Sequence, residues 1–340
     1  MYSKTIIIAE AGVNHNGSID MAKKLIDAAA ESGVDYVKFQ IWKTEEILAQ
    51  NAPKAKYQIE NDGQSSQYEM AKRLELSFDD YKKLKEHCEK VGVGFLATPD
   101  DYPSLDFLTD NLKQSIVKVG SGEVTNIPFL KRIGKKGVEV ILSTGMSSLG
   151  EVEKAYQTLL TNGAKRVSIL HCTSSYPAPF ETLNLYAIQT LKSAFKTRVG
   201  YSDHTQGTEA SVAAVALGAE IIEKHFTLDK NLPGPDHKAS IEPRELLLLV
   251  KQIRNIELGL MGSGLKEIQN IEIETKAVVT KSIYLRENIN KGEIISEDKM
   301  LFMRPVDEIP VQLFEHVVNR KALNNILAGK PLKWRDIDFS

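Results

Sequence analysis

Two histidines, His204 and His225, follow two predicted strands that are successive along the chain. His204 stands in the segment GYSDHT at residues 200–205, and His225 stands in the segment EKHF at residues 223–226. In an α/β barrel, the carboxyl ends of the strands build the active site. Two imidazoles brought to one barrel mouth bind a divalent metal and leave coordination positions open for a substrate. The alternative is that they are two unrelated loop histidines.

Two lysines, Lys38 and Lys118, lie within apolar runs at the ends of two other predicted strands. A buried ammonium group requires an anion nearby, so lysines on different strands predict one multiply charged ligand, such as a phosphate or a carboxylate. Ser143 and Ser202 supply hydroxyl donors at two further strand ends. The alternative for each lysine is a salt bridge to a glutamate of a neighbouring strand, or a side chain that extends its charge to solvent.

Two carboxylates are candidates for the same site. Glu10 stands at the end of the first predicted strand. An apolar context makes a carboxylate costly there unless a cation or hydrogen-bond donors lie near it. Asp236 lies in the turn PGPDH at residues 233–237, for which a simple surface turn is the alternative.

A histidine and a cysteine, His171 and Cys172, end the sixth predicted strand. Adjacent residues of a strand point to opposite faces of the sheet, so these two are not expected to act together as a nucleophile and its base. We expect His171 to be a donor inside the barrel and Cys172 to be a packed small residue.

These residues belong to an alternating series of short apolar runs and amphipathic stretches. Such runs are expected of parallel strands that are covered on both faces. The eight predicted strands are Thr5–Ala9, Tyr36–Gln40, Gly94–Thr98, Ser115–Val119, Glu139–Ser143, Arg166–His171, Thr197–Gly200 and Glu220–Glu223. The predicted helices include Ser18–Ser32, Ser77–Val91, Leu149–Leu160, Gly207–Gly218 and Glu242–Leu258. Eight βα units in about 260 residues are typical of a TIM barrel. The alternative, a doubly wound open sheet, would carry a glycine fingerprint after its first strand, and this sequence has none there.

The sequence changes character after the segment Gly262–Gly264. Residues 265–280 are predicted to form a linker with some helical content, and short β runs follow at Ser282–Leu285 and Leu301–Arg304. Gly292 and Gly329 fit tight turns. The predicted organisation is therefore an α/β barrel over residues 1–264, a linker over 265–280 and a small β-rich domain over 281–340. The core of that domain is thin, so we expect it to lean on a partner surface.

The composition is that of an ordinary globular protein, with 42% apolar and 26% charged residues and a net charge of −2 over 340 residues. No long run of one sign occurs, so neither nucleic-acid binding by a basic patch nor a polybasic membrane anchor is expected. No apolar run has the length of a membrane span, and the chain begins in a strand instead of a signal peptide. Nothing requires its two cysteines to form a disulfide, which predicts a cytoplasmic protein.

Taken together, the segments at the predicted strand ends resemble the sialic acid synthase family. In chain order the matching segments are EAGVNHNG (10–17), KFQ (38–40), TP (98–99), KVGSGE (118–123), STGM (143–146), HCTSSYP (171–177), GYSDHT (200–205), EKHFT (223–227) and GPDH (234–237). Residues 281–337 resemble that family's C-terminal antifreeze-like (SAF) domain. The resemblance implies a TIM barrel with a divalent metal (Mn²⁺ or Mg²⁺), and phosphoenolpyruvate and an N-acetylated amino sugar of the mannosamine type as substrates. It also implies a domain-swapped homodimer, in which the SAF domain of one subunit covers the barrel mouth of the other.

The residues and the resemblance together predict a role for each candidate. His204 and His225 hold the metal, and Glu10 handles a proton or binds near the metal. The residues predicted to bind phosphoenolpyruvate are Lys38, Lys118, Ser143 and Ser202. Thr98, Ser121 and Ser174 are further predicted substrate-binding residues, and Glu123, Tyr176, Asp236 and Arg304 are predicted to bind the sugar. The family often has Arg-Pro-Gly-Asn-Gly in its SAF domain, whereas here Arg304-Pro305 is followed by Val306-Asp307, so the path of this loop stays open.

The predicted reaction is an aldol-type condensation. The methylene carbon of phosphoenolpyruvate attacks the sugar aldehyde, water adds to the product, and phosphate leaves. The first choice of sugar is N-acetylmannosamine, which gives N-acetylneuraminate, and the alternative is 2,4-diacetamido-2,4,6-trideoxymannose, which gives legionaminate. Two other classes of function are a TIM-barrel metallohydrolase, which would usually bring more metal ligands, and a non-catalytic carbohydrate-binding protein.

Overall fold

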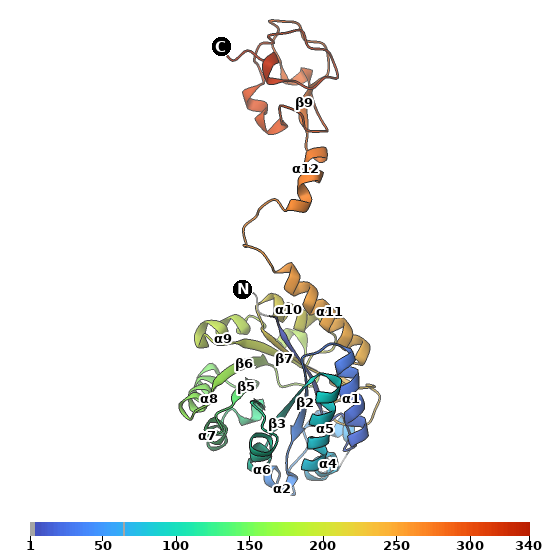
Figure 1. Cartoon of the computed structure of the whole chain (residues 1–340), viewed down its shortest axis with the longest axis vertical. Helices are drawn as coiled ribbons and strands as arrows, with labels where there is room; N and C mark the ends of the chain where they lie inside the picture. The colour runs from blue at the N-terminus through green and yellow to red at the C-terminus, as the bar shows by residue number, and fades with distance from the viewer. Residues whose placement is uncertain (1–3, 64) are drawn as a thin grey trace. The chain divides into compact units, whose positions relative to one another are not determined.

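The eight predicted strands form one parallel sheet that curls into a barrel in the computed structural model, which describes residues 4–63 and 65–340. The strand order is β3-β2-β1-β8-β7-β6-β5-β4, and β3 and β4, at the two ends of this order, are in contact. Figure 1 shows the strands at the centre of this unit with helices around them. The strands are β1 Ile6–Gly12, β2 Tyr36–Ile41, β3 Gly94–Pro99, β4 Ile116–Val119, β5 Glu139–Ser143, β6 Arg166–Cys172, β7 Val199–Asp203 and β8 Ile221–His225. The predicted TIM barrel is confirmed.

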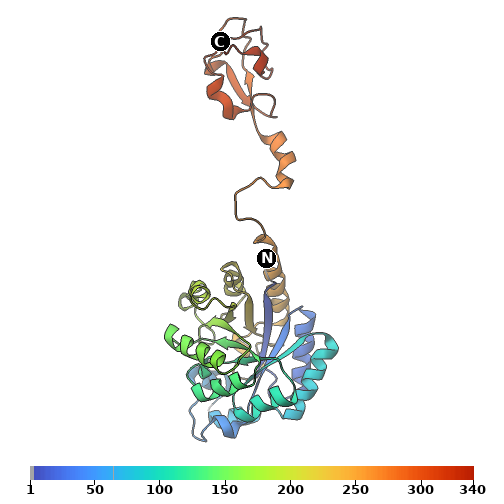
Figure 2. The same cartoon turned by 60° about the vertical axis from the view of Figure 1, so that its left-hand side comes forward.

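The helices of this unit surround the sheet, and the turned view in Figure 2 shows the same ring. They are α1 Ile19–Glu31, α2 Thr44–Ile47, α3 Lys56–Asp62, α4 Gln67–Leu74, α5 Phe78–Val91, α6 Tyr102–Asp106, α7 Ile127–Lys135, α8 Leu149–Thr161, α9 Ala187–Phe195, α10 Glu209–Ala216 and α11 Pro243–Gly259. Ser18, Ser77 and Ser148 cap α1, α5 and α8, because each hydroxyl accepts a hydrogen bond from a backbone N–H of the first turn. Among the helices that the structure describes, none is long and apolar enough to cross a bilayer.

Side chains inside the barrel alternate along each strand with side chains that face the helices. The floor of the interior is apolar and consists of Ile8, Leu96, Ile141, Leu170 and Ile221, each from a different strand. Two positions further toward the carboxyl end, the same five strands carry Glu10, Thr98, Ser143, Cys172 and Glu223, all of them buried. The barrel therefore changes from apolar to polar within one step of the strand repeat.

The strands β7 and β8 run further than the sequence predicted, because their ladders continue past residues 200 and 223. Asp203 pairs with Lys224 across β7 and β8, and Glu10 pairs with His225 across β1 and β8. The polar residues after positions 200 and 223 had favoured an earlier end for both strands. They remain in strands because their side chains find polar partners at the barrel mouth and in the layer outside it.

The long connection between β2 and β3 builds an extra wall at the carboxyl end of the barrel. It contains α2, α3 and α4, and the sequence predicted no element there before Ser77. An apolar cluster separate from the barrel cores lies in this region and comprises Val13, Trp42, Met70, Ala71 and Leu74. We call these five residues the mouth cluster, because Val13 follows β1 and Trp42 follows β2.

A second compact unit begins at Gly262. Residues 265–279 are exposed and include α12, Ile273–Val279. The strands β9 (Ser282–Leu285) and β10 (Met300–Met303) pair in antiparallel fashion over an apolar core of their own. Gly292 and Gly329 have φ values of 84° and 74°, as tight turns require. The prediction of residues 1–264 as barrel, 265–280 as linker and 281–340 as small domain differs by a few residues from this division at Met261 and Gly262.

Candidate active site

The carboxyl end of the barrel holds a cavity of about 190 Å³, which we call the inner cavity. Every barrel strand, or the loop that follows it, contributes a residue to its wall. The predicted site residues that line it are Glu10, Lys38, Thr98, Lys118, Ser121, Ser143, Tyr176, Ser202, His204 and His225. Residues from distant parts of the sequence thus meet around one small space.

Two lysines and two glutamates form a buried charged group in this cavity. Lys38 Nζ lies 2.7 Å from Glu10 Oε2 and 3.7 Å from Glu223 Oε2, and Lys118 Nζ lies 3.3 Å from Glu223 Oε1. None of these side chains is more than 4% exposed. The salt-bridge alternative for each lysine is therefore real in this structure. It does not exclude an anion site, because both lysines also line the cavity.

Hydroxyl groups extend this charged group. Lys38 donates to Thr98 Oγ1 at 3.0 Å, and Lys118 donates to Ser143 Oγ at 2.7 Å. The hydroxyl hydrogens of Thr98 and Ser143 are not used in these contacts, so each can donate to a ligand. An anion in the inner cavity would be met by ammonium and hydroxyl donors together.

The electrostatics hold the group close to neutral. Burial would raise the pKa of Glu223, but Lys118 and Lys38 lower it to about 2. Burial raises the pKa of Glu10 despite the attraction of Lys38. Burial would lower the pKa of Lys38, but Glu10 and Glu223 raise it, whereas for Lys118 burial prevails and the pKa falls. Glu223 is thus the fixed negative charge between the two lysines.

His204 and His225 face the same space, with ring centroids 5.4 Å apart. Burial lowers the pKa of both imidazoles, so both are neutral at pH 7, and this is the form that binds metals. His204 Nδ1 lies 2.8 Å from the Thr173 carbonyl oxygen, so this nitrogen carries the proton and Nε2 keeps its lone pair. His225 Nδ1 is buried without a hydrogen-bond partner, 3.9 Å from Asp236 Oδ2.

These residues fit a divalent metal, although the described part of the chain contains no arranged group of three or more His, Cys, Asp or Glu side chains. Two neutral imidazoles supply nitrogen donors, and the unpartnered Nδ1 of His225 gains a partner when a cation binds. Glu10, which pairs in register with His225, adds carboxylate oxygens nearby. A mixed set of imidazole and carboxylate donors suits a divalent metal ion.

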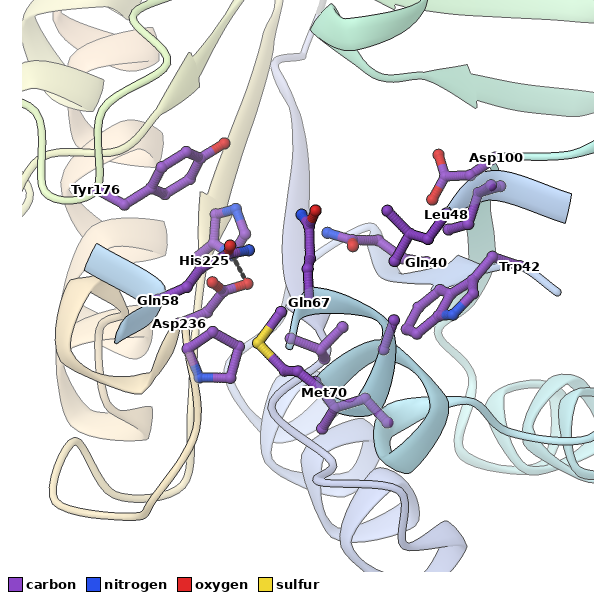
Figure 3. A pocket seen from close by; sticks show the side chains of 15 residues that line it. Gln40, Trp42, Leu48, Gln58, Gln67, Met70, Asp100, Tyr176, His225 and Asp236 are labelled. Carbon is purple, nitrogen blue, oxygen red and sulfur yellow. Dashed lines mark ion pairs between the residues drawn. The ribbon is translucent and has the colours of Figure 1, made fainter. Parts of the chain in front are cut away.

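A second cavity of about 280 Å³, which we call the outer cavity, shares Gln40, Asp100, Tyr176 and His225 with the inner cavity. Figure 3 shows Asp236 beside His225 on one side of it. Burial raises the pKa of Asp236 to about 7 and that of Asp100 to about 7. Near neutral pH these two carboxyl groups can therefore donate as well as accept hydrogen bonds.

The remaining predicted residues lie around these cavities or elsewhere. Ser121 Oγ accepts a hydrogen bond from the Gly145 backbone N–H at 3.0 Å, and Ser174 lies against the same glycine. Glu123 accepts a hydrogen bond from Asn126 at 2.6 Å and contributes to the raised pKa of Asp100. Arg304 is exposed in the second unit, directly after β10.

The predicted orientation of His171 and Cys172 is wrong. His171 Nε2 lies 2.7 Å from the Leu183 carbonyl oxygen, outside the barrel, whereas Cys172 lines the inner cavity with its Sγ 3.2 Å from Ser121 Oγ. The two adjacent side chains do point to opposite faces of the sheet, but His171 faces outward and Cys172 faces inward, the reverse of the prediction. Leu170 belongs to the interior floor, so the alternation places Cys172 inside.

Four side chains of the inner cavity were not among the predicted site residues: Gln40, Asp100, Cys172 and Glu223. Gln40 bridges the two cavities and donates from Nε2 to Glu10 Oε1 at 3.2 Å. Glu223 precedes His225 by two positions, so the strand repeat that places His225 at the mouth also places Glu223 inside. The two-residue spacing between Glu223 and His225 could therefore have identified Glu223 from the sequence.

A parallel eight-stranded barrel with ammonium, hydroxyl and imidazole groups at its carboxyl mouth has the architecture of a TIM-barrel enzyme, with a cavity whose donors can meet a small anion. The NeuB family model matches residues 25–266, and the SAF domain model matches residues 280–338. The chain belongs to the NeuB family and carries a SAF domain, as the sequence predicted. It is an enzyme of the sialic acid synthase class.

Individual proteins agree with this assignment. The chain is 50% identical to an N,N'-diacetyllegionaminic acid synthase of Campylobacter jejuni, over 95% of this chain and 97% of the relative. It is 44% identical to an enzyme of the same name from Legionella pneumophila, over 98% of this chain and 94% of the relative. A solved structure of an N-acetylneuraminic acid synthetase from Leptospira borgpetersenii, in complex with citrate, is 38% identical with a TM-score of 0.72. It covers 81% of this chain, and 90% of that chain is matched.

Proposed function

We propose that this protein condenses phosphoenolpyruvate with the open-chain aldehyde of an N-acetylated mannosamine-type sugar and releases phosphate. The observation that carries this proposal is the inner cavity, in which two buried lysines and several hydroxyls lie beside two neutral imidazoles. The adjoining outer cavity has the amides and carboxyl groups that a polyhydroxylated substrate requires.

The polyanionic substrate occupies the inner cavity. Lys38 and Lys118 bind its charged oxygens, and Ser143 and Ser202 add hydroxyl contacts. Thr98, Ser121 and Ser174 complete this set. The group is preorganised, because the lysines are already buried and held by Glu10 and Glu223 before a ligand arrives.

His204 and His225 would hold a divalent metal, with Mn²⁺ or Mg²⁺ as the candidates. Such an ion, when bound, polarises the sugar aldehyde as a Lewis acid. The chain's own part is to keep both imidazoles neutral and to fix the tautomer of His204 through the Thr173 carbonyl.

The bonds change in two stages. The methylene carbon of phosphoenolpyruvate bonds to the aldehyde carbon, and the aldehyde oxygen takes up a proton to become a hydroxyl. Water then bonds to the cationic carbon and loses a proton, which leaves a hydroxyl group on that carbon. The carbon–oxygen bond to phosphate breaks, the hydroxyl loses its proton to become the ketone, the departing phosphate takes up a proton, and a keto acid and phosphate remain. Glu10, which is buried with a raised pKa in the inner cavity, is the candidate for proton transfer.

The sugar lies in the outer cavity, where Asp236 and Tyr176 bind it. Glu123 and Arg304 are further candidates for this role. N-acetylmannosamine and 2,4-diacetamido-2,4,6-trideoxymannose both satisfy the proposed chemistry, and the names of the Campylobacter and Legionella relatives support the second.

We further propose a domain-swapped homodimer, in which the SAF domain of one subunit covers the barrel mouth of the other. Its support is the segment 265–279, which exposes apolar side chains such as Ile271 and Ile273 to solvent in the single chain. The free thiols of Cys88 and Cys172 support a reducing compartment, the cytoplasm.

The test is phosphate release by the purified full-length chain with Mn²⁺. Release that requires both phosphoenolpyruvate and an N-acetylated mannosamine-type sugar would support the condensation. Release from a phosphorylated substrate without any sugar would favour a metallohydrolase. Sugar binding without phosphate release under any of these conditions would favour a carbohydrate-binding protein.

A further inference from the structure

One wall of the outer cavity is apolar, which is unusual for a site that must bind a polyhydroxylated substrate. All five residues of the mouth cluster line it, and Ile47 and Leu48 extend the same surface. Trp42 Nε1 donates to Thr44 Oγ1 at 3.2 Å, so the polar atom of this indole is already satisfied and its ring offers an apolar face. Figure 3 shows Trp42 and Leu48 across the cavity from Asp236 and His225.

The polar part of the outer cavity favours a neutral ligand. Its amide side chains are Gln40, Gln58 and Gln67, and its carboxyl groups are Asp100 and Asp236. Among the described residues that line it there is no lysine or arginine. A phosphate group here would meet two carboxyl groups and no cation from the barrel itself, whereas acetamido groups match the amide donors and acceptors.

The direction of the sugar follows from the two cavities. Its aldehyde carbon must lie close to the inner cavity, where the lysines hold the other reactant, and His225 and Tyr176 mark this junction. The far end of the open-chain sugar, carbons 4 to 6, then extends toward Trp42, Leu48 and Met70. This is the end at which the candidate sugars differ.

We propose that the mouth cluster determines specificity at carbons 4 to 6, and that it selects a sugar with a 6-methyl and a second acetamido group. This inference rests on the proposed function and names the sugar class, a 2,4-diacetamido-2,4,6-trideoxyhexose. An apolar wall gains by burying the methyl groups of such a sugar and loses by desolvating a 6-hydroxyl. One methyl or methylene group in an apolar pocket changes kcat/KM about ten- to two-hundredfold.

The experiment compares three sugars with the full-length enzyme at saturating phosphoenolpyruvate: 2,4-diacetamido-2,4,6-trideoxymannose, N-acetylmannosamine and N-acetylmannosamine 6-phosphate. The expected order of kcat/KM is the diacetamido sugar first, N-acetylmannosamine about tenfold or more below it, and the 6-phosphate lowest. Equal values for the first two sugars, or a 6-phosphate used as well as either, overturn the inference. No sugar-dependent phosphate release at all would overturn the proposed function instead.

The variant Met70→Gln tests the wall itself, because glutamine keeps the length of the side chain and adds an amide. It should lower the preference for the diacetamido sugar over N-acetylmannosamine about tenfold. Met21→Gln, on α1 and packed against the barrel core, is the matched control and should leave this preference unchanged. If Met70→Gln melts below the assay temperature, Leu48→Gln, at a half-buried position, serves the same purpose. A folded wall variant with an unchanged preference overturns the inference.

Discussion

Replacing Lys118 by methionine removes one ammonium group from the inner cavity and keeps a side chain of similar length. Lys118 Nζ donates to Ser143 Oγ at 2.7 Å and lies 3.3 Å from Glu223 Oε1. A hydrogen bond to a charged group contributes about 1.5–3 kcal/mol. Its loss should raise the KM for phosphoenolpyruvate about ten- to a hundredfold, and the KM for the sugar should change far less.

The same substitution also affects stability, because it leaves Glu223 with fewer cationic partners. Breaking a buried ion pair by removing one partner costs about 3–5 kcal/mol. Lys224→Met is the matched control, because Lys224 is 1% exposed and pairs with Asp203 at 2.9 Å. Lys224 is the next residue along β8 after Glu223, so it faces the helices and not the cavity. It should lose comparable stability and keep its KM for phosphoenolpyruvate.

The assay is phosphate release at varied phosphoenolpyruvate and saturating sugar, with a thermal melt of each variant. A folded Lys118→Met enzyme with a lowered Tm and an unchanged KM would show that Lys118 serves only as a structural partner of Glu223. An equal rise of KM in Lys224→Met would show that KM reports general destabilisation. Either result would refute the assignment of Lys118 to the anion.

Three further predictions follow from the site. EDTA should abolish turnover and Mn²⁺ should restore it. Calorimetry should show that the His225→Ala variant, still folded, binds Mn²⁺ at least tenfold more weakly, and full activity of this variant after chelation would contradict the metal assignment. Mixed Arg304→Ala and Glu10→Ala subunits should regain part of the activity, and a verified mixed dimer without activity would place Arg304 outside the partner's site. In the metal-free protein the contribution of Asp236 to stability should fall as pH rises from about 4 to about 7, because folded Asp236, with its pKa raised to about 7, holds a proton that the unfolded chain releases. Tm measured against pH should therefore rise more, or fall less, in Asp236→Asn than in the unchanged protein over this range, and an identical slope in both proteins would contradict the prediction.

The strands and the main site residues were predictable because each barrel strand has a short, recognisable sequence pattern. Each strand is a short apolar run, and a polar residue near its carboxyl end lies at the barrel mouth when it belongs to the inward-facing set of the strand. Glu10, Lys38 and His225 were found in this way. The same repeat would have shown Glu223, since it lies two positions before His225, and would have placed Cys172 inside the barrel, two positions after Leu170.

The outer cavity was less predictable, because short helices carry weak local signals. The helices α2, α3 and α4 have four, seven and eight residues, and helices of this length depend on tertiary packing. Met70, Ala71 and Leu74 lie at a helical spacing, but their partners Val13 and Trp42 belong to other loops. Only the closed barrel brings these loops together, so the apolar wall could not be derived from any one segment.

The four buried charged residues that lie above the apolar floor of the barrel serve the site and not the stability of the fold. TIM-barrel interiors are filled mainly by branched apolar side chains, and Ile8, Leu96 and Ile141 follow this pattern. One step higher the pattern is broken by two lysines and two glutamates, all nearly inaccessible to solvent. A buried ion pair is weak support for a fold, since apolar replacements of similar volume are often neutral or stabilising. Stability therefore does not require this layer. A site that must meet a polyanion with preorganised charge does require it, because donors fixed before binding need no reorganisation when the reaction occurs.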